Sequence, residues 1–133
     1  MTPRPARTLR GRAIHAGEAS GVALCSPEPI SFYGGVDLDS GVISEAGHPL
    51  HGRPLAGTIL VFPTGKGSTV GSYAILRLVR SGLGPAALVM ASCDTTVAVG
   101  AIIAELPCVD LVDLSQLRSG DRLTVRGEEV EVG

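Results

Sequence analysis

Aromatic residues are scarce in this chain. Its 133 residues include two phenylalanines, two tyrosines and no tryptophan. We therefore expect a core built from valine, leucine, isoleucine and alanine, the apolar residues that remain to fill it. Nucleic-acid-binding domains present a basic surface, often with exposed aromatic rings for stacking. The net charge of -2 and the lack of any basic stripe thus argue against nucleic acid as a partner.

Cysteines and long apolar runs are also few. The cysteines Cys25, Cys93 and Cys108 lie far apart and form no Cys-x-x-Cys pair, which predicts neither a disulfide framework nor a metal site within the chain. No stretch approaches the roughly 20 apolar residues of a membrane-spanning helix. The arginine-rich start is not followed by an apolar run, so it does not indicate a secretory signal. We expect a reduced, cytoplasmic protein without a membrane partner.

Glycine and proline, in contrast, are abundant, with 18 and 9 residues, and predict many tight turns and short strands. The length fits a single domain over residues 1–133, whose polar, proline-containing segment 1–7 we expect to be frayed. A long region at 31–57 is dense in turn residues. Loops of this length are usually functional or disordered, and the phenylalanine, tyrosine and histidines within it favour a functional one.

The centre of the chain alternates between strand and helix patterns. Short runs rich in β-forming residues predict buried strands at 58–62, 86–91 and 108–112. Helices are expected between them, at 69–80 and from an N-cap at Asp94 or Thr95 to about 105. Weaker patterns predict strands at 9–15 and 22–25, a turn at 17–21, and a hairpin of 122–125 with 128–132. This order predicts an α/β fold with a central β-α-β-α-β unit, flanking hairpins, and a mixed sheet that curls toward a barrel.

The candidate for chemistry is a glycine loop between the first buried strand and its helix. It reads Pro63-Thr64-Gly65-Lys66-Gly67-Ser68-Thr69. Glycines let a ligand approach the main chain closely, and the amides at a helix N-terminus attract a carboxylate or phosphate. Lys66 adds a positive charge. Ser68 can cap the helix or, as an alkoxide stabilised by that field, do chemistry, and the residues alone leave both roles open. The spacing matches neither a Walker loop nor a dinucleotide fingerprint.

Three further segments accompany this loop. They read Ser31-Phe32-Tyr33-Gly34-Gly35-Val36-Asp37, Gly41-Val42-Ile43 and His48-Pro49-Leu50. Together with 65–68 they resemble the small subunit of aconitase X, over about residues 10–115. The resemblance implies a swivelling β/β/α domain that pairs with a large subunit. It also implies that the large subunit carries an iron–sulfur cluster, that this chain alone binds no cofactor or metal, and that the assembled enzyme is a hydro-lyase for a small carboxylate substrate.

The same resemblance assigns roles within the glycine loop. Ser68 would be the catalytic base that removes the proton next to the substrate carboxylate, and its neighbours Gly65, Lys66, Gly67 and Thr69 would bind the substrate. Aconitases proper carry an arginine shortly after this serine, whereas Thr69, Val70 and Gly71 follow it here. The missing contact would then come from Lys66, the helix amides or the partner subunit.

The long loop allows two interpretations. Phe32, Tyr33, Gly34, Gly35 and His48 either belong to a packed loop with an aromatic anchor or face the substrate cleft or the large subunit. His48 in particular has the features of a structural histidine, since it precedes a proline that holds its backbone extended.

Several functions remain open at this point. The resemblance implies dehydration of either cis-3-hydroxy-L-proline or mevalonate 5-phosphate. Of these two substrates, the arginine- and alanine-rich usage, which is typical of bacterial chains, favours cis-3-hydroxy-L-proline, with mevalonate 5-phosphate as the alternative. An alternative of another class is a non-catalytic domain that binds a partner or anion through 65–68. Phosphotransfer on a histidine is disfavoured, because His15, His48 and His51 lie outside the glycine loop. In the enzyme interpretation the isolated chain is expected to be inactive.

Overall fold

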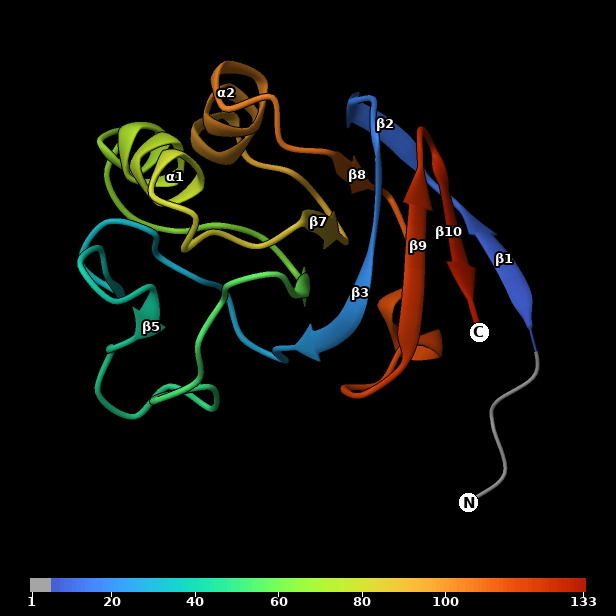
Figure 1. Ribbon diagram of the computed structural model, residues 1–133, viewed down its shortest axis with the longest axis horizontal. Coiled ribbons are helices and arrows are strands. Elements are labelled where there is room, and N and C mark those ends of the chain that lie inside the picture. The colour runs from blue at the N-terminus through green and yellow to red at the C-terminus, as the bar shows by residue number, and fades with distance from the viewer. Residues whose placement is uncertain (1–5) are drawn as a thin grey trace.

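The structure, a computed structural model, describes residues 6–133. Its elements in chain order are β1 (Arg7–Arg10), β2 (Arg12–His15), β3 (Glu18–Cys25), β4 (Val36–Asp37), β5 (Val42–Ile43), β6 (Ile59–Phe62), α1 (Gly71–Arg80), β7 (Ala87–Met90), α2 (Thr95–Ile103), β8 (Cys108–Asp110), the short 3-10 helix η1 (Leu114–Gln116), β9 (Arg122–Arg126) and β10 (Glu129–Val132). The two helices lie side by side on one face of a curved sheet (Figure 1). Within residues 6–133, no helix has both the length and the apolar character to cross a bilayer.

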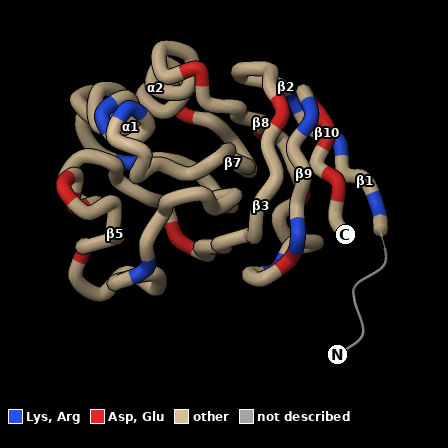
Figure 2. Tube along the Cα trace, viewed as in Figure 1, with Lys and Arg blue, Asp and Glu red and all other residues tan. Residues whose placement is uncertain are grey.

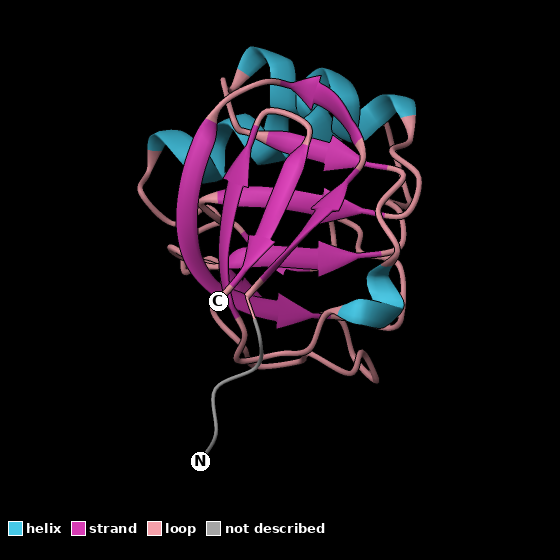
Figure 3. Ribbon diagram, turned by 90° about the vertical axis from the view of Figure 1, so that its right-hand side faces the viewer, coloured by secondary structure: helices cyan, strands magenta, loops and turns pink. Residues whose placement is uncertain are grey.

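The main sheet has eight strands in the order β1-β10-β9-β3-β6-β7-β8-β2. Strand β3 joins its two halves, since its first part pairs antiparallel with β9 and its last residues pair parallel with β6. Strands β1 and β2 stand at opposite ends of this order, yet only Gly11 separates them in the chain. The sheet therefore curls back on itself without closing, and its antiparallel strands cross in front of the parallel ones (Figure 3). The predicted mixed, curled sheet is confirmed.

Two apolar cores lie on the two faces of the parallel strands. Along β6, Ile59 and Val61 face the antiparallel half of the sheet, whereas Leu60 and Phe62 face the helices. Strand β7 alternates in the same way. Because both faces are covered, these strands consist of continuous apolar runs. The result is the β/β/α layering that the resemblance implied.

The helices approach each other closely at a glycine. A Cβ atom on Gly100 would lie 2.7 Å from Ile75 Cδ1 and 3.2 Å from Ser72 Cα, so a larger residue would require α1 and α2 to shift apart or Ile75 to repack. Helix α2 begins with Asp94 as its N-cap, whose side chain accepts a hydrogen bond from the Val97 amide. Of the two caps predicted, the aspartate is the one used.

The predicted strand at 9–15 and the predicted turn at 17–21 are both wrong in detail. The strand breaks at Gly11, where a Cβ would lie 2.2 Å from the Asp110 carbonyl oxygen, and its halves join opposite ends of the sheet. Residues 18–21 are extended within β3, because β9 supplies a pairing partner for each of them. In the segment expected to be frayed, Arg7 pairs with Val132, while residues 1–5 lie outside the described part of the chain.

Candidate active site

The glycine loop and the first segment of the long loop lie against each other. The Lys66 amide donates to the Ile30 carbonyl at 3.1 Å, and the Ile30 amide donates to the Thr64 carbonyl at 3.2 Å. Gly67 has a φ of +103°, and a Cβ on it would lie 2.7 Å from Ser31 Oγ. The backbone conformation of residue 67 therefore favours glycine, and a larger side chain would also have to displace the Ser31 hydroxyl. Motifs more than thirty residues apart thus form one surface.

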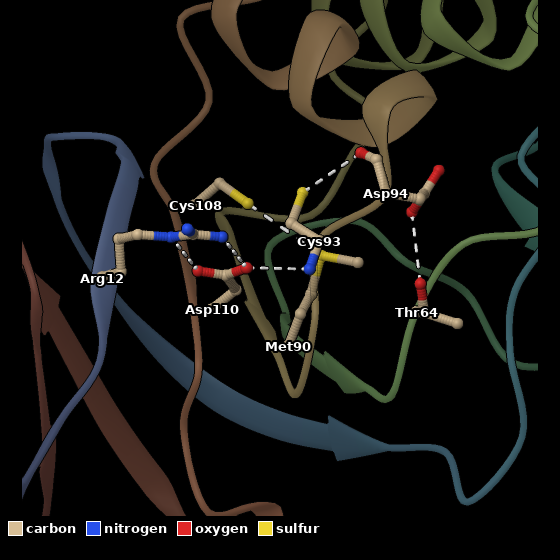
Figure 4. A network of polar contacts seen from close by, with 7 residues as sticks. All are labelled: Arg12, Thr64, Met90, Cys93, Asp94, Cys108 and Asp110. Atoms are coloured by element: carbon tan, nitrogen blue, oxygen red, sulfur yellow. Dashed lines mark hydrogen bonds and ion pairs between the residues drawn. The ribbon is translucent and has the colours of Figure 1, made fainter.

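Asp94 fastens the start of this loop to α2. Its Oδ1 lies 3.5 Å from the donor Thr64 Oγ1 (Figure 4). The same oxygen accepts the Gly65 amide at 2.8 Å, while Oδ2 accepts the Val97 amide at 3.2 Å. A Cβ on Gly65 would lie 2.6 Å from the same carboxylate oxygen. The sequence indicated Asp94 only as a helix cap, since nothing in its local pattern points to a loop 29 residues earlier.

Ser68 is exposed at the turn that leads into α1. Its Oγ accepts a hydrogen bond from the Val70 amide at 3.2 Å. Helix α1 begins at Gly71, two residues later than predicted, because 68–70 form a tight turn in which the Gly71 amide donates to the Ser68 carbonyl at 2.9 Å. Within residues 6–133 the amides of Gly67, Ser68 and Thr69 donate no hydrogen bond, which leaves them available to an anion.

Lys66 carries an ion pair that the sequence did not reveal. Its Nζ lies 3.0 Å from Glu45 Oε2, and both side chains are partly exposed. Glu45 comes from the long loop, 21 residues earlier, so no local spacing could have indicated the pair. Exposed pairs of this kind contribute only about 0–1 kcal/mol, and a bound anion can therefore compete for the ammonium group.

Phe32 and His48 lie inside the protein. Phe32 packs edge-on against Phe62, with ring centroids 5.8 Å apart. His48 Nδ1 accepts the Leu50 amide at 3.0 Å, so Nε2 carries the proton and donates to the Pro29 carbonyl at 3.1 Å. Both side chains are buried and satisfied, and their contribution is to hold the long loop in place.

Tyr33, Gly34 and Gly35 differ in their exposure and in the space around them. The Tyr33 side chain is 52% exposed, and its backbone nitrogen lies near Gly71 at the start of α1. Gly34 has a φ of +95° and open space around it, whereas a Cβ on the buried Gly35 would lie 2.4 Å from the Ser31 carbonyl oxygen. Gly35 is thus a packing requirement. A role for Tyr33 and Gly34 toward a cleft or partner stays a prediction.

Two hollows open near the loop. One, of about 530 Å³, lies between α1 and α2 and includes Thr69 and Val70 in its lining. The other, of about 590 Å³, is lined by residues that include Cys25, Pro63 and Leu117. Ser68 lines neither hollow. The exposed side chain of Ser68 therefore stands on an open surface beside these hollows and not within them.

The described residues do not fit an iron–sulfur cluster or another metal centre. Within 6–133, no three His, Cys, Asp or Glu side chains gather as a group that could hold a metal ion. A cluster needs several cysteine thiolates. The neighbouring Cys93 side chain, together with burial, raises the pKa of the Cys108 thiol, which favours its protonated form.

Comparisons with known proteins agree with this architecture. The family model described as aconitase X swivel domain matches residues 8–132. A phosphomevalonate dehydratase small subunit from Thermococcus onnurineus is 46% identical over 121 residues, which cover 91% of this chain and 93% of that protein. The corresponding small subunit from Pyrococcus furiosus is 47% identical over 124 residues, covering 93% and 92%.

A solved structure of the same family also matches this chain. The crystal structure of aconitase X from Thermococcus kodakaraensis, in its holo-form, matches with a TM-score of 0.93 and 44% identity, covering 96% of this chain and 98% of that one. The family match extends over nearly all of the described residues, and the structural match covers almost the whole of both chains. This chain belongs to the aconitase X swivel-domain family.

Proposed function

We propose that this chain is the small subunit of a dehydratase acting on mevalonate 5-phosphate, and that Ser68 is the base of the reaction. The observation that carries the proposal for Ser68 is its geometry, an exposed hydroxyl hydrogen-bonded by the Val70 amide beside three amides with no partner among the described residues. The substrate is supported by the relatives, which are named phosphomevalonate dehydratase small subunits. Residue usage favoured cis-3-hydroxy-L-proline, and the relatives support the alternative better.

Dehydration removes a proton and a hydroxyl group from neighbouring carbons. A serine hydroxyl takes up a proton only as an alkoxide, which water at neutral pH does not favour. The Val70 amide donates to Ser68 Oγ, and the partial positive charge at the start of α1 lies next to it. Both stabilise negative charge on that oxygen, and hence its action on the proton next to the substrate carboxylate.

The substrate has two anionic groups, a carboxylate and a phosphate. The amides of Gly67, Ser68 and Thr69 can donate hydrogen bonds to either anionic group. The ammonium group of Lys66 can contact the same anion while it remains paired with Glu45. These groups take the place of the arginine that aconitases proper carry after the serine. The share of this chain in the reaction is thus proton transfer and anion binding.

The remaining machinery belongs to a large subunit in this proposal. An iron–sulfur cluster, if the enzyme uses one, does not fit the described residues of this chain and would be held by that partner. Closure of this domain over the partner would exclude water from Ser68, which now stands on an open surface.

The test is the variant Ser68→Ala, co-expressed with the large subunit of the same organism. We expect kcat for mevalonate 5-phosphate to fall about 10²- to 10⁴-fold, the usual range for loss of a general base, while the two subunits still associate. Ser81→Ala removes another exposed serine hydroxyl at the far end of α1 and should leave turnover unchanged.

Two results would contradict the proposal. Near-normal turnover by the Ser68→Ala complex would remove Ser68 as the base. Dehydration of cis-3-hydroxy-L-proline, but not of mevalonate 5-phosphate, by the wild-type complex would reverse the assignment of the substrate.

A further inference from the structure

Helix α2 lacks a polar face. Residues 95–104 include no charged side chain, and in Figure 2 the α2 tube is tan between the red segments at its two ends. A helix that is apolar all round is normally buried all round. Here the inner residues Val97 and Ala101 are buried, whereas Val99, Ile102 and Ile103 are exposed. The outer side of α2 therefore has the composition of a buried surface without a cover from residues 6–133.

Helix α1 extends this apolar area. The hollow of about 530 Å³ between the helices is lined by side chains that include Tyr73 and Leu76 of α1 and Val99 and Ile103 of α2. The Tyr73 side chain is 69% exposed, and Val70 at the turn before α1 is also exposed. We call these five residues the α1–α2 surface. Single exposed apolar residues are ordinary, but a contiguous group beside a groove marks a docking site.

The α1–α2 surface is continuous with the candidate active site. Its groove begins at Thr69 and Val70, the two residues that follow Ser68. The Val70 amide also donates the hydrogen bond to Ser68 Oγ. A partner that encloses a substrate over Ser68 would therefore lie next to Val70 and the mouth of the groove. At its other end the groove reaches Arg80, a cation in the last turn of α1.

We propose that the α1–α2 surface docks the large subunit, which places an apolar segment between Tyr73 and Val99 and a carboxylate near Arg80. The proposal rests on the proposed function, which supplies the partner. A second copy of this chain on the same surface would cover Val70 and obstruct the approach to Ser68. This obstruction favours the large subunit as the occupant.

The test compares two substitutions of exposed valines. Val99→Arg inserts a charge into the groove, and Val22→Arg inserts the same charge on β3, where the side chain is exposed to almost the same degree, 45% against 44%. We expect Val99→Arg to weaken association with the large subunit of the same organism by about tenfold or more, since a charge in a desolvated apolar contact is costly. Val22→Arg should stay within about twofold of wild type.

The measurement is titration calorimetry between the purified subunits. Circular dichroism and urea unfolding of each variant establish that it is folded. An affinity of Val99→Arg within about twofold of wild type would overturn the docking proposal, whatever Ser68→Ala does. Weakened association together with normal turnover of the Ser68→Ala complex would support the docking and remove Ser68 as the base, so the two failures are distinguishable.

Analytical ultracentrifugation of the isolated chain tests the alternative that a second copy of the chain covers the α1–α2 surface. A monomer supports the proposal. A dimer that Val99→Arg dissociates, with unchanged affinity for the large subunit, would assign the surface to a second copy and overturn it.

Discussion

The carboxylate of Asp94 links the candidate catalytic loop to helix α2. One oxygen accepts the Gly65 amide and the other caps the helix through the Val97 amide. An asparagine has only one acceptor oxygen in its side chain, so it can keep one of these contacts and must turn its NH₂ group toward the other amide. Substitutions at position 94 can therefore test the placement of the glycine loop separately from the stability of helix α2.

The variant Asp94→Asn should lose activity with little loss of stability. Asparagine caps helices as well as aspartate does, whereas Asp94→Ala should cost about 1–2 kcal/mol of unfolding free energy. Because the Gly65 anchor is lost in both, we expect kcat of the assembled enzyme to fall about ten- to a hundredfold in both, an effect of misplaced geometry. Urea unfolding, steady-state turnover and exchange of the Gly65 amide measure these effects.

The matched control is Asp113→Asn. Asp113 caps the short helix η1, and its side chain accepts the Ser115 amide rather than an amide of the glycine loop. This variant should keep wild-type turnover. Unchanged kcat in Asp94→Asn, with normal exchange at Gly65, would show that the anchor does not position the site.

At the scale of elements, a charged pair joins the last strand of the sheet to its neighbour. Asp110 on β8 is completely buried, and Arg12 on β2 donates two hydrogen bonds to it, from Nε at 2.9 Å and Nη2 at 2.8 Å (Figure 4). The Cys93 amide adds a third at 2.9 Å. Burial raises the pKa of Asp110, but the Arg12 guanidinium and the Cys93 amide outweigh it and hold that pKa below its usual range.

The pair predicts how stability depends on pH. Because the pKa of Asp110 is lowered by folding, its contribution is complete above the unfolded pKa of about 3.9 and is lost as the pH falls through the lower folded value. Arg12→Ala leaves a buried carboxylate without its ion-pair partner and should cost about 1–3 kcal/mol at pH 7. The difference from wild type should shrink toward acid pH, where the unpaired Asp110 becomes protonated.

Urea unfolding at several pH values measures this difference. Arg126→Ala, which removes two exposed ion pairs, is the comparison and should cost no more than about 1 kcal/mol. A cost for Arg12→Ala that is the same at pH 7 and at acid pH would contradict the account of Asp110.

For the whole molecule, the exposed loop predicts that the isolated chain has no dehydratase activity. Ser68 stands on an open surface, and the described residues include no group that fits a metal or cluster. Adding the large subunit of the same organism should produce activity that saturates as the complex forms. Turnover of mevalonate 5-phosphate is the measurement, and substantial activity of the purified chain alone would contradict the division of the active site between two subunits.

Local patterns predicted the central elements well, for a physical reason. A strand buried on both faces must be apolar throughout, as in β6 and β7, and a helix packed on one side must repeat its apolar residues at helical spacing, as in α1. Gly11 shows the limit of such patterns. Nothing in the pattern around it indicates a break, and the need for glycine arises from the Asp110 carbonyl and neighbouring valine side chains that are distant in the sequence.

The sequence by itself determined the alternating strands and helices, the glycine loop with Ser68, and the family resemblance, because each depends on residues close together in the chain. The tertiary structure alone decided what surrounds that loop. It placed Ser31 against Gly67, Asp94 on Gly65 and Glu45 on Lys66, and it buried His48 while leaving α2 uncovered on one side. These contacts join residues many positions apart, so they follow from the path of the chain and not from any local pattern.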